Sequence, residues 1–339
     1  MRVCLAIFVL LYAVPGTAQN VIAYYTGEGR DLDSYSLNEL THIIYAFGHL
    51  HGDQMSLTSG DSVAIRRLVR QKRKHPALKI LLSLGGWEGC NSCAAVFAKP
   101  AGRKAFAHSV MRLLDQFDAD GIDIDWEFPD VAENFTALMQ TLQDSLRPDK
   151  ELSFIAAAFA PYLQHSYDWP QVMQLVTRVN LMTYDLIGSR SPITGHHAAL
   201  YSSGPQLESV DHAIHYLDSL NVPHSKIAIG AAFYAREFDL VPDSNNGLFQ
   251  PGHFKRFLTL SQCRRLPGYR QYWDPQAQAA YSYNSEKKSF LTFDDARSVA
   301  AKAGYVRQQR LDGILFWKLT LDRPRGGLLD TIYKTFHIW

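Results

Sequence analysis

The sequence predicts an α/β fold, a (β/α)8 TIM barrel with a small α+β insertion between the seventh strand and the seventh helix. Three observations predict it. The 339 residues suffice for one barrel of this kind. Short apolar, β-branched runs alternate with amphipathic helical stretches, as expected of βα units that build a parallel sheet. The stretch between the last two runs is too long for one connecting helix.

The predicted barrel has eight strands, enough to close a barrel whose interior is filled by side chains. The strands are the runs 21–25, 42–47, 79–84, 121–128, 152–159, 178–184, 226–234 and 313–319. Helical patterns between them cover 62–74, 103–117, 131–146 and 210–220, with the seventh helix at 293–310. The predicted domains are therefore a barrel over 19–236 and 293–339, and a small α+β insertion over 237–292 on the barrel's C-terminal rim.

The first 18 residues have the three parts of a signal peptide. Met1 and Arg2 precede an apolar run, 3–14, and small residues precede Gln19. The run is too short to span a bilayer unaided, which disfavours the alternative of a retained membrane anchor. We therefore expect a secreted protein, extracellular or, in a Gram-negative host, periplasmic, with no membrane attachment after signal removal.

The charge balance points to a neutral partner. Lys and Arg number 34 and Asp and Glu 33, so no strong overall field exists to recruit nucleic acid or an anionic membrane. The 17 Tyr, 18 Phe and 6 Trp suit stacking on sugar rings but are equally ordinary in a barrel core. We expect no cofactor, and a monomer is the default.

Three cysteines remain once Cys4 leaves with the signal peptide. Cys90 and Cys93 are spaced to close a small local disulfide in an oxidising compartment. The alternatives are a redox site and half of a zinc site. Zinc needs about four ligands, and no second close Cys or His pair accompanies these two. Cys263 is then expected to be a free, buried thiol.

The densest chemical signal lies in the fourth predicted strand. Side chains alternate across a strand, so its acidic and apolar residues face opposite sides. In a barrel covered by helices, the apolar side packs outward against the helices and the acidic side lines the interior. The last acidic residue then lies at the C-terminal mouth, where the active sites of barrel enzymes are found. The acids are Asp123, Asp125 and Glu127, and the apolar residues are Ile122, Ile124 and Trp126.

Three carboxyls in one column cannot all stay ionised at low cost. Repulsion and burial both raise carboxyl pKa values, so at least one proton is expected to be shared near neutral pH. A retained proton is what a general acid needs, which makes Glu127 at the mouth the candidate acid. Two alternatives are that the acids are solvated or paired with Arg, and that alternating Asp residues hold a divalent metal. The metal is disfavoured because no phosphate-binding Gly-rich loop accompanies them.

These residues resemble the signature of glycoside hydrolase family 18, the chitinase family, which reads Asp-x-x-Asp-x-Asp-x-Glu. It stands complete as Asp120, Asp123, Asp125 and Glu127. Three further motifs follow the family's order, so the resemblance extends across essentially the whole mature chain. They are Ser-Leu-Gly-Gly-Trp at 83–87, Met-Thr-Tyr-Asp at 182–185 and Phe-Trp at 316–317.

The resemblance implies substrate-assisted hydrolysis with retention of configuration. Glu127 would protonate the glycosidic oxygen while the substrate's own 2-acetamido oxygen attacks the anomeric carbon, giving an oxazolinium-like intermediate. Asp125 would hold the acetamide N–H and offset the developing positive charge, with Asp123 sharing a proton behind it. Tyr184 would hydrogen-bond the acetamide oxygen.

The resemblance also implies a set of sugar-binding residues. Trp317 would form the floor of the subsite at the cut, and Asp185 and Arg236 would bind the sugar from the rim. Two positions depart from the usual pattern, because Ala235 replaces Gly and Lys318 stands where many bacterial relatives have Glu. The expected substrate-binding residues are Asp120, Trp317, Met182, Asp185, Trp87, Tyr24, Phe47 and Arg236.

The expected function is hydrolysis of chitin or N-acetylglucosamine oligosaccharides. One alternative is an endo-β-N-acetylglucosaminidase that cuts N-glycan cores, and another is a non-hydrolytic chitin-binding lectin. Lectins on this fold typically lack the terminal acid, and Glu127 is present. The insertion favours a long linear substrate. Its Tyr269, Tyr272 and Trp273 either line a deep groove or form the insertion's own core.

Overall fold

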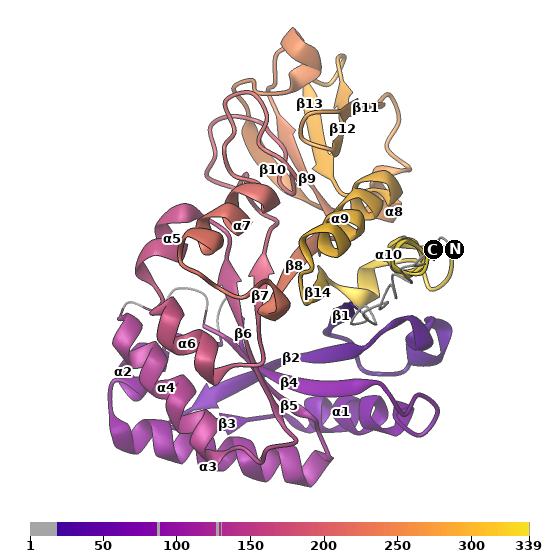
Figure 1. Ribbon diagram of the computed structural model, residues 1–339. Helices are drawn as coiled ribbons and strands as arrows, with labels where there is room; N and C mark the ends of the chain where they lie inside the picture. Colours follow the sequence, from indigo (N-terminus) through magenta and orange to yellow (C-terminus); the bar gives the residue numbers. More distant parts are fainter. Residues whose placement is uncertain (1–18, 87–88, 127–128, 130, 339) are drawn as a thin grey trace, which may run out of the picture.

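The computed structural model describes residues 19–86, 89–126, 129 and 131–338, and over these residues eight parallel strands close into a barrel (Figure 1). The strands follow one another around the barrel in chain order, and the last pairs with the first. The fold predicted from the sequence is thus confirmed. The barrel strands are β1 (Asn20–Tyr25), β2 (His42–His51), β4 (Lys79–Gly85), β5 (Gly121–Asp125), β6 (Glu151–Ala157), β7 (Arg178–Met182), β8 (Ile227–Ala232) and β14 (Gly313–Trp317).

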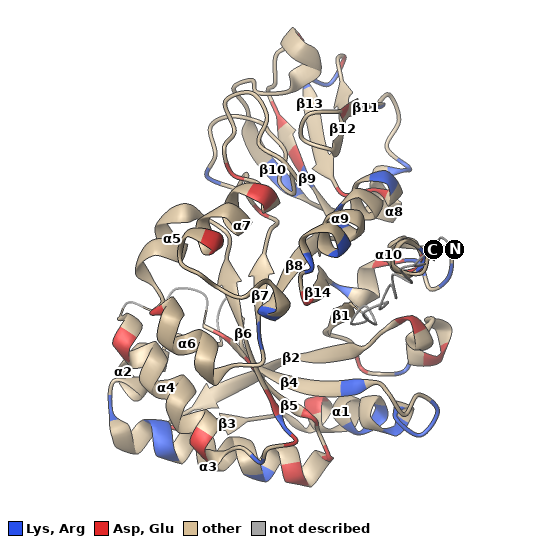
Figure 2. Cartoon of the chain, viewed as in Figure 1, with Lys and Arg blue, Asp and Glu red and all other residues tan. Residues whose placement is uncertain are grey.

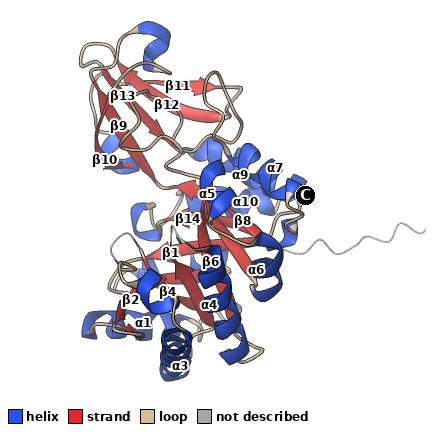
Figure 3. Cartoon of the chain, turned by 90° about the vertical axis from the view of Figure 1, so that its left-hand side faces the viewer, coloured by secondary structure: helices blue, strands red, loops and turns tan. Residues whose placement is uncertain are grey.

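Helices cover the outside of the barrel, as the side view in Figure 3 shows. A short strand, β3 (Gln54–Ser56), pairs antiparallel with the end of β2. Among the described residues, no helix has the length and apolar character that crossing a membrane requires. The helices are α1 (Ser59–Gln71), α2 (Cys93–Phe97), α3 (Pro100–Phe117), α4 (Ala132–Ser145), α5 (Ala160–His165), α6 (Trp169–Leu175), α7 (Val210–Ser219), α9 (Ala296–Gln309) and α10 (Leu328–Phe336).

The two faces of β5 separate as its alternation predicts. Ile122 and Ile124 belong to the large core between the sheet and the helices. Trp126 joins the same core just after the strand, with its ring centre 5.5 Å from that of Phe97 and 6.1 Å from that of Phe135. The acidic residues of the strand therefore point into the barrel.

The N-terminal end of the barrel is closed by buried charges. Arg178, which starts β7 and is 2% exposed, donates to Glu151 at 2.7 Å and to Asp312 at 2.9 Å. Burial alone would raise the pKa of Glu151, but the hydrogen bond from His42 and the charge of Arg178 bring it below its ordinary range. The paired charges leave no isolated ion in the core, which would cost several kcal/mol.

The insertion is a five-stranded antiparallel sheet standing on the C-terminal rim (Figure 1). Phe233 alone separates β8 from the first insertion strand, so the chain runs almost straight out of the barrel into the second sheet. This sheet starts three residues before the predicted insertion and ends one residue after it. Its elements are β9 (Tyr234–Asp239), β10 (His253–Thr259), α8 (Leu260–Cys263), β11 (Arg270–Asp274), β12 (Ala279–Asn284) and β13 (Ser289–Phe293), in the sheet order β10-β9-β13-β12-β11.

A buried ion pair fixes the return of the chain to the barrel. Asp294 follows β13, and its carboxylate binds the ammonium of Lys302 on α9 at 2.5 Å, with side-chain exposures of 1% and 0%. The same carboxylate accepts from the backbone N–H of Ala232 at the end of β8 and from Ser298. The two crossings between barrel and insertion are therefore tied to each other.

The cysteine predictions are confirmed except for one detail. Cys90 and Cys93 form a disulfide that closes a four-residue loop. Cys263 is free but partly buried rather than fully buried, because it lines a pocket in the insertion. Burial raises the pKa of its thiol to about 12.

Candidate active site

The centre of the site is a carboxylate inside the barrel, supplied by Asp123 of β5. It is fully buried and accepts four hydrogen bonds, each from a different strand of the barrel. Burial raises the pKa of Asp123, and the donated hydrogen bonds only partly offset this effect. A carboxyl in such surroundings can hold or share a proton near neutral pH. The donors are Tyr24 (2.9 Å) and Ser83 (2.9 Å) to Oδ2, and Ser153 (2.6 Å) and Asn180 (3.0 Å) to Oδ1.

Asp125 lies two residues further along the same face, at the C-terminal end of β5. It is 3% exposed. Its backbone is in contact with Gly85 of β4, where a Cβ would lie 2.0 Å from the carbonyl oxygen of Asp125. A side chain at position 85 would therefore push the two strand ends apart. Burial and the charges of Asp123 and Asp125 raise the pKa of Tyr24 well above its ordinary value, so this phenol stays a neutral donor.

Aromatic side chains and a methionine form the upper layer of the barrel interior. Trp317 at the end of β14 stacks on Phe47, with ring centres 5.8 Å apart at 19°, and tilts against Tyr24 at 5.8 Å. The peptide bonds Ala46–Phe47 and Trp317–Lys318 are both cis. This layer groups five of the residues predicted from the sequence, namely Tyr24, Phe47, Met182, Tyr184 and Trp317.

The ring of Tyr184 occupies space that a glycine on the next strand, Gly230 of β8, leaves open. A Cβ at Gly230 of β8 would lie 2.7 Å from Cε1 of the Tyr184 ring. On the other side the ring packs edge-on against Tyr234 at 6.1 Å. Tyr184 is thus held between β8 and the first residue of the insertion.

The rim carries a third carboxylate, Asp185, which is bound by two residues and approached by another. Nε of Arg236 on β9 donates to one carboxylate oxygen at 2.6 Å, and Nη2 forms an ion pair with the other oxygen at 2.6 Å. The Tyr234 hydroxyl donates at 2.5 Å. Nδ1 of the fully buried His197 lies 3.5 Å away. Burial alone would raise the pKa of Asp185, but hydrogen bonds from His197 and Arg236 and the charge of Arg236 bring it far below its ordinary range. Asp185 is therefore ionised and already paired.

A pocket of about 390 Å³ opens between the rim and the insertion. The barrel contributes Trp317 and Asp185, and the insertion contributes Phe257, whose side chain is 54% exposed. The guanidinium of Arg236 lies 4.7 Å from the centre of the Phe257 ring and holds it. The remaining lining residues are Tyr234, Leu258, Thr259, Gln262, Lys318 and Leu321. An apolar, aromatic pocket with a few polar groups suits a sugar ring.

The sequence model of the protein family Glycosyl hydrolases family 18 matches residues 20–322 of this chain. The chain belongs to this family. The N-acetylglucosaminidase of glycoside hydrolase family 18 from Paenibacillus barengoltzii has a similar structure, with 33% identity, a TM-score of 0.85 and coverage of 94% of this chain and 99% of that one. Chitinase B of Serratia marcescens is 28% identical over 88% of this chain and 76% of its own length. Chitotriosidase-1 of Mus musculus is 29% identical over 96% and 78%.

As a member of family 18, the protein is a glycoside hydrolase of the chitinase type. Its predicted site residues fall into three groups. Asp123 and Asp125 lie inside the barrel, below the layer that contains Tyr24, Phe47, Met182, Tyr184 and Trp317. Asp185 and Arg236 meet at the rim. Glu127 and Trp87 lie outside the described residues.

The substrate-binding role predicted for Asp120 needs correction. Asp120 precedes β5 and so lies at the end of the barrel opposite the mouth. Its carboxylate binds Lys72 at 2.8 Å and the backbone N–H of Ile80 at 2.7 Å. This family 18 signature residue therefore joins α1, β4 and β5. Within the described ranges, no three His, Cys, Asp or Glu side chains form a metal-binding group.

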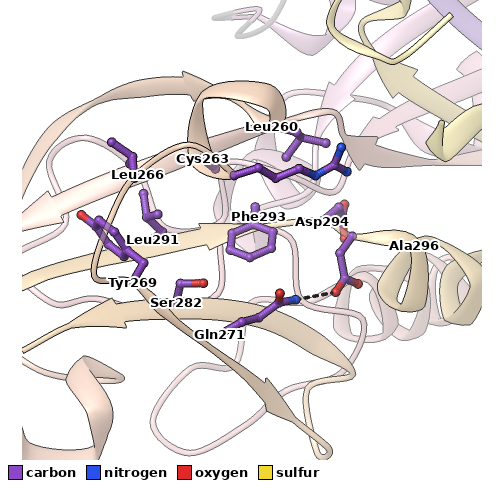
Figure 4. Close-up of a pocket in the computed structure, with 12 residues that line it drawn as sticks. Leu260, Cys263, Leu266, Tyr269, Gln271, Ser282, Leu291, Phe293, Asp294 and Ala296 are labelled. Carbon is purple, nitrogen blue, oxygen red and sulfur yellow. Dashed lines mark hydrogen bonds between the residues drawn. The ribbon is translucent and has the colours of Figure 1, made fainter.

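The insertion aromatics named from the sequence are absent from the described lining of the pocket between rim and insertion. Tyr272 stacks on Tyr281 within the insertion core, and Trp273 is covered by Arg297 at 3.8 Å. Tyr269 lines a different pocket of about 490 Å³ on the other side of α8, where Phe293 lies at the centre (Figure 4). Tyr269 and Tyr272 thus fit the insertion-core interpretation, whereas Trp273 packs against Arg297 of α9. Phe257 is the residue of β10 whose aromatic ring lines the pocket between rim and insertion.

Sequence reasoning missed several residues of the enzyme's site. Asn180 could have been found, because it shares its strand face with Met182 and Tyr184. Ser153 could have been found in the same way, because it shares its strand face with Ile155, which lies inside the barrel. His197 and Phe257 carry no such signal, because their places depend on how a loop and the insertion pack on the rim.

Proposed function

We propose that the protein hydrolyses β-1,4-linked N-acetylglucosamine polymers or oligomers by substrate-assisted catalysis with retention of configuration. The observation that carries this proposal is the buried carboxyl column of Asp123 and Asp125 beneath Tyr184 and Trp317. A column of this kind can stabilise a positively charged intermediate formed from the substrate's acetamide without any enzyme nucleophile.

The proposed reaction has two steps. First, Glu127 protonates the glycosidic oxygen, the bond to the anomeric carbon breaks, and the acetamide oxygen of the same sugar attacks that carbon. Asp125 accepts a hydrogen bond from the acetamide N–H and offsets the positive charge. In the second step Glu127 takes a proton from water, and the water oxygen opens the oxazolinium-like ring.

Asp123 supports this role of Asp125 from below. Its raised pKa allows the two carboxyls to share one proton while the site is empty. As positive charge develops on the sugar, that proton can move onto Asp123 and leave Asp125 ionised. The Tyr184 hydroxyl is the candidate donor to the acetamide oxygen, and the Trp317 indole is the candidate floor under the sugar ring.

We also propose that the protein is secreted after removal of residues 1–18. The disulfide between Cys90 and Cys93 supports this, because disulfides persist in oxidising compartments. Charged residues of both signs are spread over barrel and insertion alike, which fits a neutral polysaccharide as the partner (Figure 2).

The decisive test is the substitution Glu127→Gln, assayed on chitohexaose. Loss of the transferable proton is expected to lower kcat by at least about 10²-fold, the range of general acid catalysis, while oligosaccharide binding by calorimetry persists. Glu133→Gln, at an exposed position in the first turn of α4, is the matched control and is expected to keep full activity. Retained turnover in Glu127→Gln contradicts the proposal.

Two further measurements test the substrate and the mechanism. NMR of the first product is expected to show the β-anomer, and an initial α-anomer would contradict retention. A high-mannose glycoprotein assayed beside chitohexaose distinguishes an endo-β-N-acetylglucosaminidase, which would release glycan faster. Because one similar structure is an N-acetylglucosaminidase, release of monosaccharide should be scored as well.

A further inference from the structure

The pocket between rim and insertion contains a lysine that the proposed reaction does not use. Lys318 follows β14 directly and lines the pocket beside Trp317. Its ammonium donates to the Thr26 hydroxyl at 2.7 Å and lies 5.4 Å from the centre of the Trp317 ring. In the described part of the chain, this ammonium forms no ion pair with a carboxylate, unlike the lysines paired with Asp243 and Asp294.

The other charges of the pocket cancel each other. Asp185 is paired with Nε and Nη2 of the Arg236 guanidinium, so this pair contributes no net charge. Tyr234 is buried, and its pKa is raised well above the ordinary value, so it is neutral. Among the described residues that line the pocket, Lys318 therefore carries the charge that is not paired with another.

The ammonium of Lys318 is available to a ligand. An ammonium has three N–H donors, and Thr26 takes one of them. Partial burial lowers the pKa of Lys318 from its ordinary value. The remaining donors can bind a sugar hydroxyl or an acetamide carbonyl.

We propose that Lys318 makes this pocket selective for N-acetylated sugars and excludes the protonated amine of a deacetylated glucosamine unit. The proposal deepens the proposed function and rests on it. A neutral acetamide accepts a hydrogen bond from the ammonium, whereas a glucosamine ammonium is repelled by it. The enzyme therefore requires an N-acetyl group on a second sugar unit, besides the unit whose acetamide takes part in the reaction. On a partly deacetylated chain it is directed to acetylated stretches.

The expected selectivity follows from the charges. Two unit positive charges about 7 Å apart, in a partly hydrated pocket with an effective dielectric constant of about 40, discriminate by roughly five- to tenfold. Salt screens such a pair, so the discrimination should shrink at about 1 M NaCl, where the Debye length is about 3 Å.

The test compares kcat/KM on fully acetylated chitohexaose with kcat/KM on chitosan of intermediate acetylation, at a pH where glucosamine is protonated. Lys318→Gln is expected to raise the chitosan-to-chitohexaose ratio about five- to tenfold, and Lys318→Glu should raise it further. Lys318→Arg keeps the charge and should keep the wild-type ratio. Lys288→Gln removes an exposed lysine on the insertion that pairs with Asp243, and so controls for overall charge.

Product sequencing by mass spectrometry locates the effect. Beyond the sugar at the new reducing end, whose acetamide the reaction itself needs, wild-type products should be acetylated at one further position. The Lys318→Gln products should be mixed there. An unchanged ratio and unchanged product positions in Lys318→Gln overturn the inference. Failure of the wild type to cut chitohexaose would instead overturn the proposed function.

Discussion

Gly230 offers a sharp test of how the site is positioned. Its Cβ, if present, would lie 2.7 Å from the Tyr184 ring and 2.9 Å from the backbone oxygen of Leu181. Carbon atoms in contact prefer separations of about 3.5–4.0 Å, so Gly230→Ala must move the Tyr184 ring by about 1 Å. Overpacking of this size typically costs about 1–3 kcal/mol of stability. A 1 Å displacement of a positioning group costs about 10²-fold in rate.

The assay for Gly230→Ala combines kcat on chitohexaose with the free energy of unfolding in urea. We expect a drop in kcat of about 10²-fold in a folded protein destabilised by about 1–3 kcal/mol. Gly304→Ala is the matched control, because nothing lies within 4 Å of its Cβ in the middle of α9. That change should leave kcat unaltered and stabilise the helix by about 0.5–1 kcal/mol.

A double-mutant cycle decides whether the effect passes through Tyr184. In a Tyr184→Ala background the ring is absent, so the Gly230→Ala change should lose most of its cost in stability. Equal destabilisation in both backgrounds would show that the backbone of Leu181, and not the tyrosine, is the obstacle. Unchanged kcat in Gly230→Ala would refute the reasoning altogether.

Two further predictions concern the buried charges. Arg236→Met should lower the free energy of unfolding by about 2 kcal/mol, less than for a fully buried pair because the Asp185 side chain is 38% exposed. Because the pKa of Asp185 is lower in the folded than in the unfolded protein, where it is about 3.9, ionised Asp185 stabilises the fold above about pH 4. The loss of unfolding free energy in Arg236→Met should therefore be full above about pH 4 and shrink below it. A loss that stays constant from pH 3 to 7 contradicts this. Arg178→Met leaves Glu151 and Asp312 without their buried partner and should cost about 3–5 kcal/mol in urea unfolding at pH 7, with a loss below about 1 kcal/mol counting against the role assigned to it.

Periodicity along single strands predicted much of the fold and the inner site. Asp123 and Asp125 point inward because the pleat alternates and helices cover the outer face. The same parity argues against Asp120, since it stands an odd number of residues before Asp123 and at the far end of the strand. A family signature records which residues recur together, whereas strand geometry decides which of them reach the substrate.

The outer part of the site could not be predicted in this way. Phe257 faces the pocket because β10 pairs with β9, which continues the line of β8, and no local pattern reveals that docking. The Asp294–Lys302 pair is similarly hidden, because a charged residue on an amphipathic helix is expected to face water. The positions of these residues depend on contacts between elements that are distant in the sequence. Local sequence patterns do not reveal such contacts.

The near-continuous path from β8 into β9 limits how this enzyme can be rebuilt. Tyr234 and Arg236 belong to the outer sheet by hydrogen bonding, yet their side chains complete the site below. A chimera that receives a larger or smaller insertion should therefore be joined after Arg236 and before Asp294. An insertion exchanged at the first residue of its sheet, Tyr234, would take away Tyr234 and Arg236, which bind Asp185. The first residues of the insertion therefore belong to the barrel's site as well.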